Sequence, residues 1–267
     1  MIDSIHDAAF AALMLAAPAS KCALVAQLQT GLESGDYRTY PGENDPVAIV
    51  HPGRPERPEL VSPQALGQRR VGSAQGHAAL LHAIAHIEFN AINLALDCVH
   101  RFRAFPAAFH SGWIKVAADE AFHFGLLCDR LHSLGAAYGD FPAHNGLWDM
   151  ACRTAHDPLA RMALVPRVLE ARGLDATPPI IEKLRRIGDQ GSIAVLERIL
   201  ADEVSHVALG DRWFKRICME RQLDPEETYL ALIDALAVAR PHPPVNEAAR
   251  LAAGFSADEL AWMMNRR

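Results

Sequence analysis

The chain has 267 residues, half of them hydrophobic, which predicts a globular protein with one large core. Its 26 basic and 32 acidic residues give a net charge of −6, without a long run of either sign. That balance argues against nucleic-acid binding, because such proteins usually carry a basic stripe. The five cysteines are scattered and form no CxxC pair, so they indicate a reducing cytoplasm rather than a disulfide framework.

The N-terminal part predicts two helices followed by an irregular arm. The apolar stretch 8–20 follows acidic residues without Lys or Arg, whereas an export signal needs positive charge there. We expect helices at about 4–16 and 20–34. The passage 37–72 is rich in proline and cannot be helical throughout. It is either a linker or an arm on the surface, and a linker is disfavoured because the preceding segment is too short for a second core.

The rest of the chain predicts further helices, because apolar residues recur at three and four positions rather than at two. Gly135, Asp157-Pro158 and Ser256-x-x-Glu259 mark helix ends. The expected helices are 73–103, 107–134, 147–155, 157–173, one after Thr177-Pro-Pro that breaks near 188–191, 192–222, 224–239 and 256–265. We therefore predict one all-α domain over 1–267, with a core four-helix bundle at about 73–222, N-terminal helices and an arm at 1–72, and C-terminal helices at 223–267.

A five-residue motif occurs twice, as "DEAFH" at 119–123 and "DEVSH" at 202–206. On a helical wheel, Glu120 and His123 project from the apolar stripe of their helix, and Glu203 and His206 project from theirs. An exposed Glu-x-x-His has no special meaning, whereas a buried one needs a partner, since an unpaired carboxylate in a core is very costly. The alternative is that these side chains are hydrogen-bonded or lie on the surface.

Two buried Glu-x-x-His turns predict a carboxylate on each of two other helices if their purpose is to hold a pair of metal ions. Glu88 lies on the apolar face of the first long helix, and Glu170 lies on a less apolar face of the third. Glu88 to Glu120 is 32 residues and Glu170 to Glu203 is 33, so the spacings in the two sets agree to within one residue. The sequence leaves open whether Glu170 bridges the metals or merely lies close to them.

The predicted ligand set is Glu88, Glu120, His123, Glu170, Glu203 and His206. Four carboxylates balance two divalent cations, and nitrogen and oxygen ligands suit iron first and manganese second, with room for zinc. Asp119 and Asp202 lie one turn before the two histidines and can orient an imidazole by a hydrogen bond, or they are exposed helix residues. His82 and His86 point away from Glu88.

The segments "AHIEFNAINLALD", "AADEAFHF", "YGDFPAHNGLWD", "VPRVLEARGLD" and "DEVSHVALG" resemble the ferritin-like superfamily, and most closely an uncharacterised bacterial family of it, a domain of unknown function. The resemblance covers about residues 70–220 and implies the same six ligands. It supplies no substrate. Its more distant relatives include ferroxidases, rubrerythrin-like peroxidases, manganese catalases, multicomponent monooxygenases and a tRNA-modifying hydroxylase.

Three functions are compatible with these residues. The first is a di-iron oxidoreductase that activates dioxygen or peroxide on an organic substrate, served by an electron-donor protein, because the segments outside the bundle are large enough to shape a pocket. The second is a ferroxidase, metal store or peroxide scavenger without an organic substrate. The third is a metal-stabilised scaffold without enzymatic activity. We expect no membrane partner, and we keep a tRNA substrate only as a special case of the first function.

Overall fold

The computed structural model describes residues 3–39, 45–67, 72–241 and 243–264 and divides the chain into two compact units, residues 1–152 and residues 153–267. The predicted all-α class is confirmed over these residues. The strands described there are β1 (Asp3–Ser4) and β2 (Tyr37–Arg38), which pair in parallel over two residues each. The prediction of one domain over the whole chain stays a prediction, and each unit is described below by itself.

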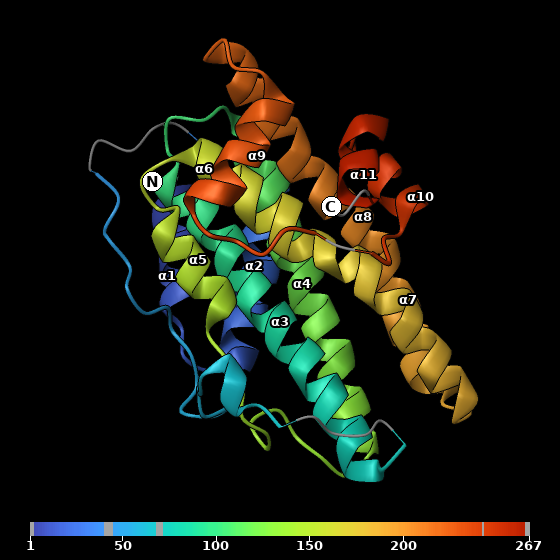
Figure 1. Ribbon diagram of the computed structural model, residues 1–267. Helices are drawn as coiled ribbons and strands as arrows, with labels where there is room; N and C mark the ends of the chain where they lie inside the picture. The colour runs from blue at the N-terminus through green and yellow to red at the C-terminus, as the bar shows by residue number, and fades with distance from the viewer. Residues whose placement is uncertain (1–2, 40–44, 68–71, 242, 265–267) are drawn as a thin grey trace. The chain divides into compact units, whose positions relative to one another are not determined.

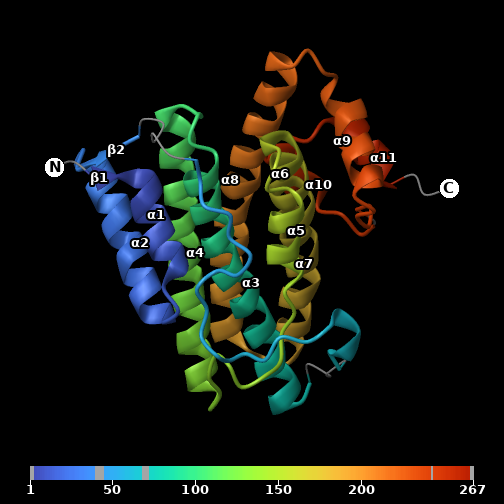
Figure 2. The same ribbon diagram turned by 90° about the vertical axis from the view of Figure 1, so that its left-hand side faces the viewer.

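The first unit is built from two helical pairs. Its helices are α1 (Ile5–Met14), α2 (Pro18–Glu33), α3 (Ala74–Arg101), α4 (Ala107–Ser133) and α5 (Gly146–Arg153). The long helices α3 and α4 pack along each other, while α1 packs on α3 and α2 packs on α4 (Figures 1 and 2). The core of this unit therefore lies between the two pairs.

Helix α3 is the central element of the first unit. It begins after Ser73, whose hydroxyl accepts a hydrogen bond from the Gly76 amide at 3.0 Å, a normal N-cap contact. Its length and hydropathy would also suit a membrane span, but 72% of its most apolar window is buried inside the protein. The burial accounts for its apolar composition, because the core helices of globular proteins have the same property.

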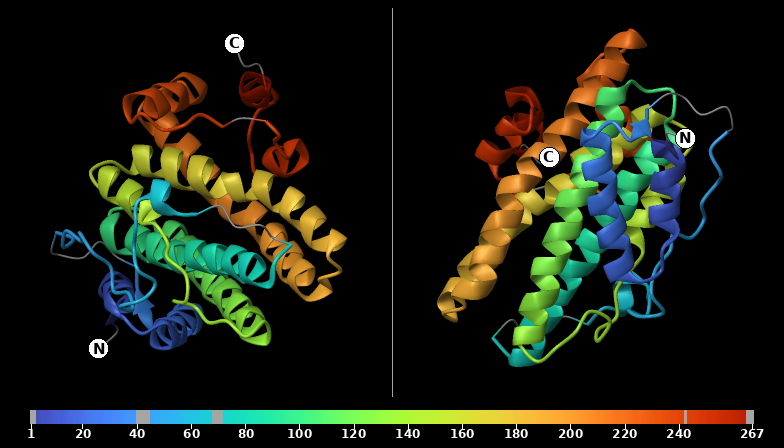
Figure 3. Two further views of the ribbon diagram at one scale, coloured as in Figure 1. Left: turned by 60° about the horizontal axis from the view of Figure 1, so that its bottom comes forward. Right: turned by 180° about the vertical axis from the view of Figure 1, so that it is seen from behind.

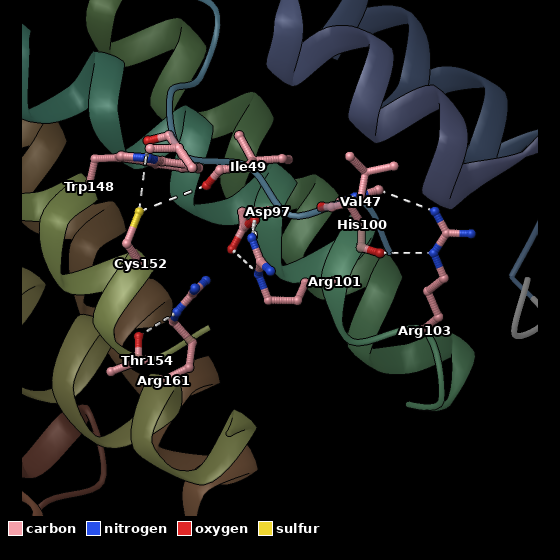
Figure 4. Close-up of polar contacts among 11 residues, drawn as sticks. Val47, Ile49, Asp97, His100, Arg101, Arg103, Trp148, Cys152, Thr154 and Arg161 are labelled. Atoms are coloured by element: carbon pink, nitrogen blue, oxygen red, sulfur yellow. Dashed lines mark hydrogen bonds and ion pairs between the residues drawn. The ribbon is translucent and has the colours of Figure 1, made fainter. Parts of the chain in front are cut away.

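The proline-rich segment forms an arm on the first unit. Between residues 45 and 67 it is irregular apart from the short 3₁₀ turn η1 (Pro63–Ala65). Its carbonyl groups are held by side chains of the first unit: His100 Nε2 lies 3.2 Å from Val47 O (both labelled in Figure 4), and Trp148 Nε1 donates to Val50 O at 2.9 Å. The prediction that this segment is not helical throughout holds for this stretch, while residues 40–44 and 68–71 lie outside the described residues.

The second unit contains α6 (Pro158–Leu164), the π-helical segment η2 (Val165–Glu170), α7 (Ala171–Arg186), α8 (Gln190–Glu220), α9 (Pro225–Ala235), α10 (Glu247–Ala252) and α11 (Ala257–Met264). Helices α7 and α8 form its main pair, and α9 and α10 also pack on α8. Near its start, the buried Arg161 donates to Thr154 Oγ1 at 2.9 Å (Figure 4).

One predicted helix end is wrong. We expected a helix to stop at Gly173 and another to begin after the two prolines, but α6, η2 and α7 form one continuous helical run to Arg186 (yellow in Figure 3). Pro178 cannot donate to the carbonyl of Leu174, four residues earlier. Asn246 Nδ2 donates to that carbonyl at 3.3 Å instead, so tertiary contacts tolerate the prolines inside the helix.

The other predicted helix signals are confirmed. Gly135 has a φ of 74° after α4, and Asp157 accepts a hydrogen bond from the Leu159 amide at the start of α6. Ser256 and Glu259 form the reciprocal capping box, in which the Ser256 amide donates to Glu259 and the Glu259 amide donates to Ser256. The short helix α10 was not predicted.

Candidate metal centre

Helices α3 and α4 bring three of the predicted ligands together in the first unit. Glu88 comes from α3, while Glu120 and His123 stand one turn apart on α4. All three side chains are buried, with exposed fractions of 3%, 1% and 0%. The apolar neighbours Ala117, Phe124 and Leu127 on α4 are buried too, as the wheel predicted.

The geometry of this group suits a metal ion. His123 Nδ1 lies 3.1 Å from Glu88 Oε2 and 3.6 Å from Glu120 Oε2. One ligand atom from each of the three residues lies within 4.8 Å of the others, so these residues can hold a metal ion. Two carboxylates and one imidazole are ligands that iron, manganese and zinc all accept.

The three groups are electrostatically coupled. Burial alone would lower the pKa of His123, but hydrogen bonds to Glu120 and Glu88, and the charges of both carboxylates, raise this pKa to about 10. Without a metal ion, the carboxylates therefore retain a proton on His123. A cation that took the place of this proton would supply the positive charge that the two carboxylates require.

In the second unit, α8 presents the second motif. Glu203 and His206 are buried, with exposed fractions of 8% and 1%, and His206 Nδ1 lies 3.6 Å from Glu203 Oε1. The same distance joins the Glu and His of the first motif. Glu170 is the last residue of η2 and is 9% exposed. Its part in a ligand set stays a prediction.

The π-helical segment η2 was not predicted. Such segments insert one extra residue into a helix and often occur at functional sites. Pro166 lies in η2 and packs on Gly210 of α8, where an added Cβ would come within 2.2 Å of Pro166 Cγ. Pro166 inside a helical pattern was the available signal, and Gly210 is the residue that lets α8 approach it.

A buried arginine fixes the same segment. Arg167, three residues before Glu170, donates to Asp211 Oδ1 at 2.9 Å and forms an ion pair with Glu259 of α11. Its guanidinium also lies 4.2 Å from the ring centroid of Tyr229. Burial alone would lower the pKa of Arg167, but the carboxylates raise it above its ordinary value, so the group is charged. Sequence reasoning missed this cluster, because its members are far apart in the chain.

Asp119 and Asp202 each contact a basic residue on their own helix. Lys115 donates to Asp119, and Arg198 Nε donates to Asp202 Oδ2 at 2.6 Å. These are i,i+4 ion pairs on partly exposed helix surfaces. The hydrogen bond from either Asp to a ligand histidine stays a prediction.

His82 and His86 contact the segment that follows α4. His82 Nε2 accepts a hydrogen bond from the Gly139 amide at 2.9 Å, and His86 Nδ1 lies 2.9 Å from the hydroxyl of Tyr138. Burial lowers the pKa of His86 to about 4, so its imidazole is neutral. The expectation that both side chains point away from Glu88 agrees with these contacts.

Fold and site together define an all-α protein with a buried carboxylate–histidine group that can hold a metal ion. The chain belongs to the family described as "Protein of unknown function (DUF455)", whose model matches residues 14–261. It is 41% identical over 266 residues to an "Uncharacterized protein" of Haemophilus influenzae, covering 94% of this chain and 91% of that one. No solved structure matches the chain.

Proposed function

We propose that the chain is a dinuclear metal protein of the ferritin-like superfamily, with iron as its metal, and that it is an oxidoreductase acting with dioxygen or peroxide on an organic substrate. One observation carries the proposal. Glu88, Glu120 and His123 are buried together, with ligand atoms within 4.8 Å of one another. Burying two carboxylates is costly, and a bound cation offsets that cost.

The second motif supports a second ion. Glu203 and His206 repeat the type, burial and 3.6 Å spacing of Glu120 and His123. With Glu88 and Glu170, the chain then offers two carboxylates and one imidazole to each ion, and four carboxylates balance two divalent cations. Under this proposal α3, η2 and the two motif helices are the four helices of the bundle.

The roles of the chain's own residues follow from their chemistry. The carboxylates supply charge, the imidazoles supply neutral nitrogen ligands, and the surrounding apolar side chains keep bulk water away from the centre. Iron bound in this way supplies redox chemistry with dioxygen or peroxide. An electron-donor protein would restore the reduced metal, and the scattered free cysteines suit a reducing cytoplasm.

Oxygen uptake after anaerobic loading with ferrous iron tests the oxidoreductase proposal. We expect uptake that saturates at about two irons per chain and falls at least tenfold in Glu120→Ala. The exposed Glu197→Ala on α8 is the matched control and should behave like the wild type. Uptake that grows with tens of irons per chain would show a ferroxidase or store instead. Bound metal without any uptake would leave a metal-stabilised scaffold.

A further inference from the structure

The first unit contains a cavity whose lining includes none of the candidate metal ligands. It has a volume of about 290 Å³ and is partly open to solvent. Its walls come from the N-terminal half of α3, from residues 141–147 and from Leu66 and Gly67. This volume is at the lower end of the range of small-molecule sites.

The cavity lies on a different face of α3 from Glu88. At 100° per residue, Ala79, Ala83 and His86 stand between about 140° and 180° from Glu88 around the helix. All three line the cavity, whereas Glu88 does not. A molecule bound there is therefore separated from the proposed metal ligands by the helix itself.

The walls are mainly apolar. Leu80, Ile87, Phe141 and Leu147 supply large hydrophobic surfaces, and no Asp, Glu, Lys or Arg is among the described residues that line the cavity. Ile87 leaves 47% of its surface exposed, so part of this apolar wall faces solvent. An apolar ligand would cover this surface, and the described lining offers a charged ligand no ion-pair partner in return for its hydration.

The cavity has one polar group that is suited to a ligand. The two ring nitrogens of His86 are engaged within the protein, with Tyr138 and with the His144 carbonyl. His144 Nδ1 accepts a hydrogen bond from the Gly146 amide at 3.1 Å. The ring proton of a neutral His144 must then be on Nε2, so this nitrogen is a donor on a residue that lines the cavity.

We propose that this cavity binds a neutral, largely apolar small molecule that carries a carbonyl-type hydrogen-bond acceptor, with His144 Nε2 as the donor to that acceptor. The apolar walls hold the body of the molecule and the single donor fixes its orientation, which is the usual division of work in small-molecule sites. The site is separate from the proposed metal chemistry and does not depend on it.

Prodan, a neutral naphthyl ketone whose fluorescence reports the polarity of its surroundings, is a suitable probe. We expect saturable binding of one prodan per chain with blue-shifted emission. Ala83→Phe places a large ring in the cavity from an exposed helix position and should weaken binding at least tenfold. His144→Phe removes the donor and should weaken binding severalfold, with less of the spectral change that a hydrogen-bonded ketone shows.

The matched control is Ala23→Phe, at an exposed alanine of α2 outside the cavity. This variant and Glu120→Ala, which removes a proposed metal ligand, should both bind prodan like the wild type. Prodan binding that does not saturate, or that is equal in Ala83→Phe and Ala23→Phe, would overturn the proposal. Equal affinity for a naphthalene sulfonate of similar size would overturn the neutral ligand class.

Discussion

Lys21 shows how a single residue can couple the first unit to pH. Its ammonium is fully buried and donates to Leu13 O at 2.9 Å, to Gly53 O at 2.8 Å and to Asn93. It therefore ties α2 to the end of α1, to the arm and to α3. Burial lowers its pKa to about 7. The unfolded chain would titrate the same group near 10.5.

The lowered pKa of Lys21 fixes the sign with which this residue makes the free energy of unfolding depend on pH. Between pH 7 and pH 10.5 the unfolded chain binds a proton at Lys21 that the folded chain lacks, so this residue makes the free energy of unfolding rise with pH. We compare the free energy of unfolding of the wild type with that of Lys21→Met. Between pH 7 and pH 10.5 we expect the wild type to gain on the order of a few kcal/mol relative to the variant. Urea unfolding at pH 7, 8.5 and 10 measures it. A difference independent of pH would contradict the lowered pKa.

At the scale of elements, the packing of α8 on the π-helical segment η2 makes a testable feature of the second unit. Gly210 lets α8 pack against Pro166, because a Cβ would come within 2.2 Å of the proline ring. We expect Gly210→Ala to lower the free energy of unfolding by about 1–3 kcal/mol through overpacking. Gly173→Ala on α7 meets no atom within 4 Å and should instead stabilise by about 0.5–1 kcal/mol. Equal or greater stability of Gly210→Ala in urea would contradict the close packing.

Glu259 connects α11 to the same segment. It pairs with the buried Arg167 and also caps its own helix. Glu259→Gln keeps a side chain that can cap but removes the charge, so it tests the ion pair alone. Leaving the buried guanidinium with one carboxylate should cost about 3 kcal/mol. Asp258→Asn, at an exposed neighbour, is the control. Thermal unfolding that does not separate the two variants would show that Asp211 is a sufficient partner.

Helix ends could be predicted where a local signal decides them. Asp157, Gly135 and the Ser256–Glu259 box act on neighbouring backbone groups, so the sequence alone places them. The continuation past Pro178 depends on Asn246, which is 68 residues away, and a local pattern cannot contain that information. The burial of Glu88 and of the two Glu-x-x-His turns could be predicted, because apolar periodicity fixes the inward face of a helix. Glu170 is buried as well, although its helix face is less apolar in the sequence. The π-helical segment η2 depends on packing against Gly210, so it could not be predicted from the sequence.

At the scale of the whole molecule, each unit contributes one buried Glu-x-x-His turn, and both turns have the same internal spacing. Under the proposed function, each turn belongs to one of two ligand sets that hold an ion each. Metal ions that bind only the native state stabilise it by mass action, so both proposed sets would link metal content to folding. The number of ions per chain is the quantity on which the proposed function depends.

The central measurement is the metal content per chain, by elemental analysis of protein purified without chelator, for wild type, Glu120→Ala, His206→Ala and the exposed control Glu197→Ala. We expect about two iron or manganese ions per chain in the wild type and the control. We expect about one ion or fewer per chain in each ligand variant. A wild type that binds no metal, even after anaerobic loading with ferrous iron, or ligand variants with the full content, would contradict the proposed function.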